Sequence, residues 1–159
     1  MELYLLRHGI AEDHSATGRD ADRGLTEEGR EKLRRVLKRA ASAGVEPSLM
    51  ISSPYKRAVQ TAEIAEAGFE YKSGVLQTNT LVPHGSPEKV WNELREHKDE
   101  NAILMAGHEP LMSHLIAYLL ASPALRIDMK KACIVRIDIG SVGAAPHGTL
   151  RWMIYPKLI

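Results

Sequence analysis

Short apolar segments alternate with longer amphipathic ones along the chain, and each kind of segment predicts a different element. Three short segments are almost wholly apolar, as expected of strands buried on both faces of a sheet: 2–6, 49–52 and 102–106. A weaker strand is predicted over 71–76. Two late apolar segments, 133–139 and 149–155, flank a loop with glycine and proline, and this pattern is typical of a hairpin.

Helical periodicity and capping residues fill most of the intervals between these strands. Thr26 is suited to be an N-cap and Gly44 a C-terminal stop, so the first helix is predicted between them. A second helix is predicted to begin at Ser53–Pro54, interpreted as N-cap and first helical residue, and to run to about Gly68. Two more helices are predicted to begin at proline signals: Ser86–Pro87 and Pro110. Alternating strands and helices favour a three-layer α/β/α sandwich with a mostly parallel central sheet.

Composition narrows the class of protein without identifying it. The 159 residues are one domain's worth, so we expect a single domain over 1–159, and the formal net charge of +1 argues against nucleic acid as the main partner. The lone Cys133 excludes a disulfide framework. No apolar run approaches the roughly 20 residues that span a bilayer, and the N-terminus lacks a signal-peptide layout. We therefore expect a cytoplasmic protein with no membrane partner; its oligomeric state stays open.

Polar residues with a common chemistry follow three of the predicted strands. Arg7-His8-Gly9 comes after the first, the segment 52–57 with Arg57 after the second, and Gly107-His108 after a third. The carboxyl ends of strands are where ligands bind in open α/β sheets. Two guanidinium groups, two imidazoles and helix N-termini gathered there would suit a phosphoryl group, because arginine forks and free N–H groups bind its oxygens.

An imidazole in such a pocket can act as a nucleophile as well as a ligand. Neutral histidine can attack phosphorus in line and carry the group briefly, while the arginines stabilise charge on the transferring oxygens. The residues alone therefore favour phosphoryl transfer through a histidine of this pocket, His8 or His108, with no metal and no cofactor. His-x-x-x-His and paired-cysteine zinc signatures are missing from the chain.

The same segments resemble the histidine phosphatase superfamily, which has a phosphoglycerate mutase-like fold. Four matching segments follow the family's order and approximate spacing: 3–9, 24–29, 53–62 and 107–108. By this resemblance His8 is the nucleophile, and Arg7, Arg57 and His108 complete the catalytic phosphate pocket. The short chain looks most like the SixA-type phosphohistidine phosphatases, which lack the helical insertion that roofs the site of sugar-phosphate enzymes.

One departure from the larger family concerns the acid that protonates the leaving group. Most members place a carboxylate after the third strand, where this chain offers only His84 before Glu88. The proton donor stays open among five residues: Glu12, Asp13, Asp22, His84 and Glu109. An alkoxide leaving group gains about 10²–10⁴-fold from a placed acid, whereas the imidazole of phosphohistidine depends on one less.

The leading hypothesis is a phosphatase that removes a phosphoryl group from phosphohistidine on a signalling protein of the histidine-phosphotransfer type. The alternatives are a phosphatase or mutase acting on a small phosphomonoester, and a non-catalytic phosphate-binding module. His84 is taken as a rim contact for the substrate, with a plain loop residue as the equal alternative. Lys130–Lys131 could attract an acidic protein partner, but we interpret the pair as part of a solvated loop.

Overall fold

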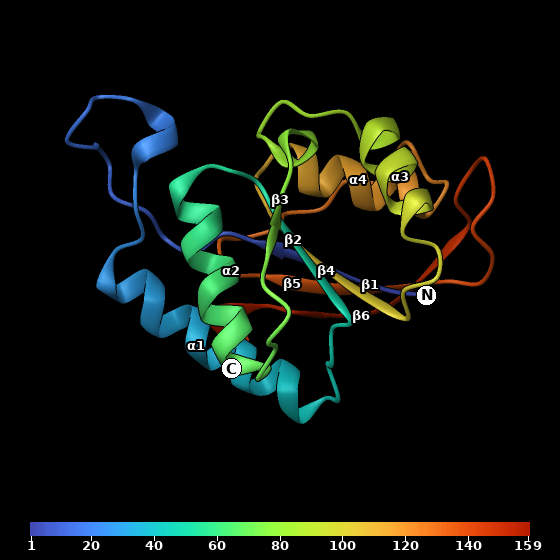
Figure 1. The fold of residues 1–159 in the computed structure, drawn as a ribbon, viewed down its shortest axis with the longest axis horizontal. Coiled ribbons are helices and arrows are strands. Elements are labelled where there is room, and N and C mark those ends of the chain that lie inside the picture. Colours follow the sequence, from blue (N-terminus) through green and yellow to red (C-terminus); the bar gives the residue numbers. More distant parts are fainter.

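A single six-stranded sheet organises the computed structural model, which describes residues 1–159 (Figure 1). Its strands are β1 (Glu2–Arg7), β2 (Leu49–Ser52), β3 (Leu76–Gln77), β4 (Ala102–Gly107), β5 (Ile134–Ile139) and β6 (Gly148–Ile154). They lie side by side in the order β3-β2-β4-β1-β5-β6. The four strands β3, β2, β4 and β1 pair in parallel, and β5 and β6 continue the sheet as an antiparallel hairpin. The prediction of a mostly parallel sheet is confirmed.

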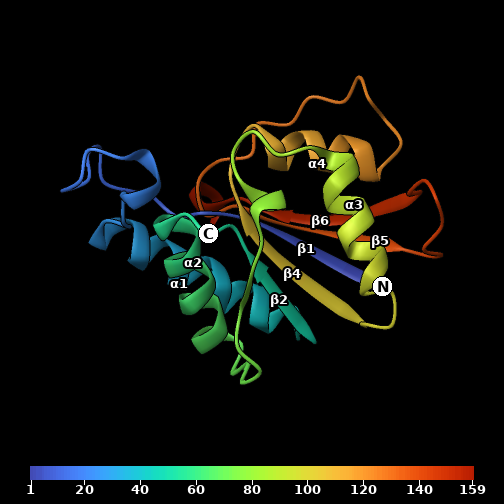
Figure 2. The same ribbon diagram turned by 45° about the horizontal axis from the view of Figure 1, so that its top comes forward.

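Helices cover both faces of the sheet, which confirms the predicted three-layer sandwich (Figure 2). The four helices are α1 (Glu27–Ser42), α2 (Lys56–Gly68), α3 (Pro87–Glu96) and α4 (Leu111–Leu119). Side chains alternate along β1, so Tyr4 and Leu6 enter the core under α1 and α2, while Leu3 and Leu5 enter the core under α3 and α4. None of the helices has the length and apolar character that crossing a membrane would need.

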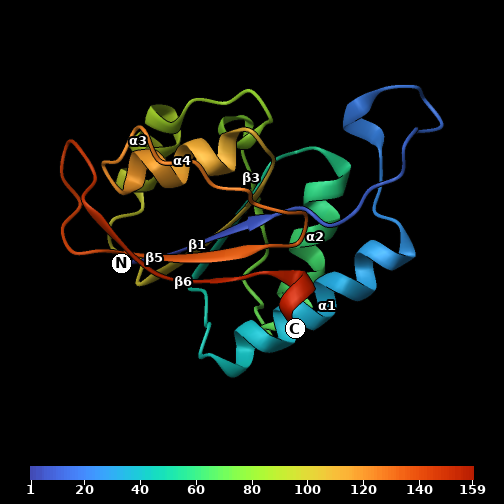
Figure 3. The ribbon, with the colours of Figure 1, turned by 180° about the vertical axis from the view of Figure 1, so that it is seen from behind.

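Three short 3₁₀ turns complete the chain: η1 (Asp20–Asp22), η2 (Asn79–Leu81) and η3 (Pro156–Leu158). The first lies in the segment between β1 and α1, which projects from the body of the molecule (Figure 1). The last ends the chain beside α1, as the view from behind shows (Figure 3). Both turns lie near the carboxyl end of β1, where the candidate site is found.

The predicted start of the second helix is wrong by about two residues. α2 begins at Lys56 with Tyr55 as its N-cap, whereas Ser53–Pro54 was expected to open it. Ser53 is still held by the sheet, since its N–H donates to the carbonyl of Ala106 at 3.0 Å. The helix therefore begins only after Ser53 and Pro54, at Lys56.

The weak strand predicted over 71–76 is also wrong in extent, because β3 contains only Leu76–Gln77. Gly74 has φ of +79°, a left-handed conformation that interrupts extended backbone. The segment 71–75 therefore forms an irregular connection after α2, and pairing with β2 begins only at Leu76.

The entry to α1 fixes the backbone that follows His8. Thr26 is the predicted N-cap, and its Oγ1 accepts the N–H of Gly29 at 3.0 Å. The N–H of Thr26 donates to the carbonyl of Ile10 at 2.9 Å. A Cβ on Gly29 would overlap that same carbonyl oxygen, so only glycine lets α1 approach the segment this closely.

We expect Gly29→Ala to destabilise the protein by about 1–3 kcal/mol, because the added methyl collides with backbone that cannot move aside. This sign is opposite to the usual gain from replacing glycine by alanine in a helix. The matched control is Gly68→Ala at the end of α2, where a Cβ meets only the Leu37 side chain at ordinary contact distance. Urea unfolding of both variants measures the difference, and a Gly29→Ala protein as stable as the control would contradict this packing constraint.

Candidate active site

The structure brings His8, Arg57 and His108 together at the carboxyl edge of the sheet. His8 directly follows β1, Arg57 lies in the first turn of α2, and His108 directly follows β4. The Nε of Arg57 donates to Nε2 of His8 at 3.3 Å, and the ring centroids of His8 and His108 are 5.0 Å apart. All three side chains are buried. Their convergence follows from the parallel pairing of β2, β4 and β1.

Backbone contacts fix the tautomer of His8. Its Nδ1 lies 2.7 Å from the carbonyl oxygen of Gly9, and a carbonyl can only accept, so Nδ1 carries the hydrogen. Nε2 is then left with a lone pair, which faces the Nε–H of Arg57. The N–H of Gly9 is itself held by Thr61 on α2 at 3.1 Å. The ring is thus locked with its nucleophilic nitrogen toward the arginine.

Burial keeps this imidazole neutral. It lowers the pKa of His8 to about 3, aided by the charges of Arg57, Arg7 and Lys131. Burial likewise lowers the pKa of His108 to about 2, with His8 and Arg57 acting in the same direction. Both histidines are therefore uncharged at neutral pH, and the lone pair of His8 Nε2 is available for attack on phosphorus.

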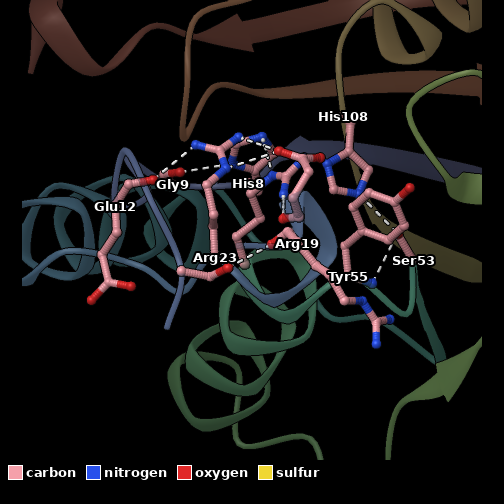
Figure 4. A network of polar contacts seen from close by, with 11 residues as sticks. His8, Gly9, Glu12, Arg19, Arg23, Ser53, Tyr55 and His108 are labelled. Carbon is pink, nitrogen blue, oxygen red and sulfur yellow. Dashed lines mark hydrogen bonds and ion pairs between the residues drawn. The ribbon is translucent and has the colours of Figure 1, made fainter. Parts of the chain in front are cut away.

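His108 is oriented by Ser53 and Tyr55, two residues of the segment 52–57 that were not predicted to contact it. Its Nε2 lies 2.8 Å from Oγ of Ser53, and that oxygen accepts the N–H of Tyr55 at 3.3 Å, as Figure 4 shows. When Ser53 donates its own hydrogen to His108 Nε2, the ring hydrogen of His108 lies on Nδ1. The Tyr55 ring packs edge-on against His108 at 5.1 Å and lies beneath the Arg57 guanidinium.

Only two buried side-chain polar atoms in the whole chain lack a hydrogen-bond partner, Nε of Arg7 and Nδ1 of His108. Arg7 is anchored at its other end, where Nη1 donates to the carbonyl of Met129 at 2.6 Å. Burial lowers the pKa of Arg7, which means that its charge has no full compensation in this site. Unpaired buried polar atoms are costly, so each of these two nitrogens is available to an anionic ligand as a hydrogen-bond partner.

Asp20, which was not among the predicted site residues, binds both terminal nitrogens of Arg57. Asp20, in η1, accepts from Nη2 of Arg57 through its side chain at 3.0 Å and from Nη1 through its carbonyl at 2.8 Å. Although partial burial acts to raise it, the pKa of Asp20 is lowered by hydrogen bonds from Arg23 and Arg57 and by their charges. Asp20 therefore takes the terminal nitrogens that a phosphoryl group would use.

None of the five candidate proton donors makes a side-chain hydrogen bond or ion pair with His8, His108 or Arg57. Glu12 joins the network only through its carbonyl, and its carboxylate points away (Figure 4). Glu109 instead accepts the N–H of Ser113 at 2.8 Å. Asp22 is paired with Thr17 and Arg19, and Asp13 lines a small surface cleft of about 160 Å³ beside Asp20.

His84 is exposed in the turn between η2 and α3, and its side chain makes no hydrogen bond or aromatic contact. Its role as a rim contact stays a prediction, as do the catalytic roles of Arg7, His8, Arg57 and His108. No group of three or more histidine, cysteine or acidic side chains lies where it could hold a metal ion.

A family profile and two curated proteins match this chain. The sequence profile described as histidine phosphatase superfamily (branch 1) matches residues 3–78. An uncharacterised protein of Picosynechococcus sp. strain PCC 7002 is 31% identical over 92% of this chain and 90% of its own length. Phosphohistidine phosphatase SixA of Escherichia coli K12 is 27% identical over 98% of this chain and 94% of its own length.

Solved structures show the same fold. The protein histidine phosphatase SixA complexed with tungstate superposes with a TM-score of 0.86 at 24% identity, covering 99% of each chain. A putative alpha-ribazole-5'-P phosphatase from Escherichia coli superposes with a TM-score of 0.76 at 22% identity, covering 98% of this chain and 97% of that one. Structures of this fold therefore include proteins named for different phosphorylated substrates.

We expect Asp20→Asn to tighten the binding of inorganic phosphate about three- to tenfold, because the neutral side chain no longer competes for Arg57. The gain is limited, since the Asp20 side chain is 57% exposed although that of Arg57 is 5% exposed. Calorimetric titration with phosphate measures it. Asp22→Asn in the same turn is the control and should change nothing; weaker binding by Asp20→Asn would mean that Asp20 supports the pocket.

Proposed function

Because the chain belongs to the histidine phosphatase superfamily, we propose that this phosphatase removes the phosphoryl group from phosphohistidine on a signalling protein, by way of a covalent intermediate on His8. The observation that carries the proposal is the state of the His8 ring. Its hydrogen is held on Nδ1 by the Gly9 carbonyl, and its Nε2 lone pair faces the buried Arg57. A pure phosphate binder has no need of a nucleophile held in this way.

The first step transfers the phosphoryl group to His8. The Nε2 lone pair attacks phosphorus, the phosphorus–nitrogen bond of the substrate breaks, and its electrons return to the substrate ring. That ring leaves as neutral imidazole when its other nitrogen carries a proton. Phosphorylated His8 becomes an imidazolium, and the Gly9 carbonyl stabilises its Nδ1–H.

The second step releases the group to water. A water oxygen attacks phosphorus, the bond to Nε2 breaks with its electrons returning to His8, and the water protons remain with phosphate or solvent. Arg7, Arg57 and Nδ1–H of His108 would bind the equatorial oxygens in both steps. We propose that these donors supply the charge stabilisation without a metal ion.

The carboxylates support phosphohistidine over a phosphomonoester. Asp20 is the carboxylate in contact with the site, and its pKa is lowered by Arg23 and Arg57, so it is a poor donor of a proton to an alkoxide. An imidazole leaving group does not need that donor. The similarity to SixA points the same way, whereas the similarity to an alpha-ribazole-5'-P phosphatase keeps a small phosphomonoester as the alternative.

A substrate panel with and without His8→Ala tests the proposal. We expect a histidine-phosphotransfer domain phosphorylated on histidine to be turned over with a higher kcat/KM than aryl or sugar phosphates, with activity retained in chelator. His8→Ala should lose at least about 10³-fold in kcat, because the nucleophile is removed. His147→Ala, on the exposed loop between β5 and β6, is the matched control and should keep full activity.

Faster turnover of a sugar phosphate would contradict the substrate assignment. Stimulation by a bisphosphorylated compound would indicate a mutase instead. Phosphate binding of normal affinity without turnover of any substrate in the panel would indicate a binding module.

A further inference from the structure

A wide groove with a positively charged lining lies beside the candidate site, between α1, η3 and the turn that precedes β5. Its volume is about 870 Å³, and its lining has no acidic side chain. Six basic residues contribute to it: Arg7, Lys32, Arg35, Lys130, Lys131 and Lys157. This concentration is notable in a chain whose formal net charge is only +1.

Most of these charges are not neutralised by neighbouring carboxylates. Lys32 pairs with Glu28 at 2.6 Å and Lys130 with Asp128 at 2.8 Å. The other four make no ion pair within 4 Å, and three of them are exposed: Arg35, Lys131 and Lys157. The groove is therefore a region of positive potential that an anionic surface would complement.

The groove is joined to the nucleophile through the backbone. The N–H of Ala132, next to Lys131, lies 3.2 Å from the carbonyl of Arg7 and 3.1 Å from that of His8. Arg7 lines the groove and directly precedes His8 in the chain. The charge of Lys131 also contributes to the lowered pKa of His8. A ligand in the groove would thus lie beside a phosphoryl group held at His8.

The size of the groove indicates what it would take. A single phosphoryl group would be held by the donors around His8, whereas the groove extends to Arg35 on α1 and to Lys157 on η3. A row of acidic side chains on a folded protein matches both the extent and the charge. η3 packs against α1 at the side of the groove, so the basic lining is built from segments far apart in the sequence (Figure 3).

We propose that this groove docks the acidic surface surrounding the phosphohistidine of the protein substrate. The inference rests on the proposed function and adds how that substrate is recognised. Lys130 and Lys131 then belong to a binding surface, in contrast to the solvated loop that their sequence alone favours. Charge complementarity of this kind speeds the encounter and falls with ionic strength.

Charge reversal away from the catalytic residues tests the docking surface. We expect Arg35→Glu/Lys157→Glu to raise KM for an acidic, histidine-phosphorylated phosphotransfer domain about tenfold, with kcat nearly unchanged. Its kcat/KM for aryl phosphate should stay that of the wild type, because a small substrate is held by the donors around His8 and not by Arg35 or Lys157. The wild-type preference for the phosphoprotein should weaken in high salt, and the variant should show less of this dependence.

A matched control reverses one arginine and one lysine on the opposite face of the sheet. Arg95→Glu/Lys89→Glu on α3 changes the net charge equally at exposed positions and should leave KM for the phosphoprotein unchanged. An equal rise in KM in both variants would overturn the docking surface and leave a general charge effect. If the wild type turns over the phosphoprotein and the groove variant does so with the same KM, the docking surface is wrong. The proposed function stands in that case.

Two further outcomes are distinguishable. If the wild type turns over aryl phosphate but no phosphoprotein, the proposed function fails and the docking inference fails with it. If the groove variant loses affinity for double-stranded DNA while phosphoprotein KM is unchanged, the groove serves nucleic acid and the inference is wrong.

Discussion

The hydrogen bond from Nδ1 of His8 to the carbonyl of Gly9 is the contact on which the rest of the site depends. It assigns the ring hydrogen, leaves Nε2 with its lone pair, and would stabilise the imidazolium once phosphorus is bound. Two neighbouring contacts help to hold that carbonyl in place. Thr61 binds the N–H of Gly9, and Gly29 allows α1 to pack against the segment that follows. The fold thus orients His8, which directly follows β1, with its Nε2 free to act as a nucleophile.

Three parallel strands explain why sequence reasoning could assemble the candidate site. Apolar runs predicted β1, β2 and β4. Because these strands pair in parallel, the polar residues that follow them lie at one edge of the sheet. His8, Arg57 and His108 therefore converge as expected. The family resemblance, read from four motifs, is confirmed by the comparisons. Local sequence patterns were enough to bring these three residues together because each lies close after the end of a strand.

Sequence patterns did not predict the roles of residues that depend on tertiary contacts. Asp20 lies in a hydrophilic stretch whose composition predicts only exposure, and its pairing with Arg57 depends on how that stretch folds back. Ser53 resembles a helix cap in sequence. In the structure its N–H bonds to the sheet and its hydroxyl contacts His108. The basic groove is assembled from residues between positions 7 and 157, a grouping that no local window contains.

The most direct test of the account is to locate phosphorus on the enzyme during turnover. The wild-type protein would be mixed with a histidine-phosphorylated phosphotransfer domain, quenched in alkali within a single turnover, and analysed by peptide mass spectrometry and phosphorus–nitrogen coupling in NMR. The account predicts one phosphoryl group on His8, bonded to Nε2. Phosphorus on Nδ1, on another residue, or nowhere on the enzyme while phosphate is released would contradict it.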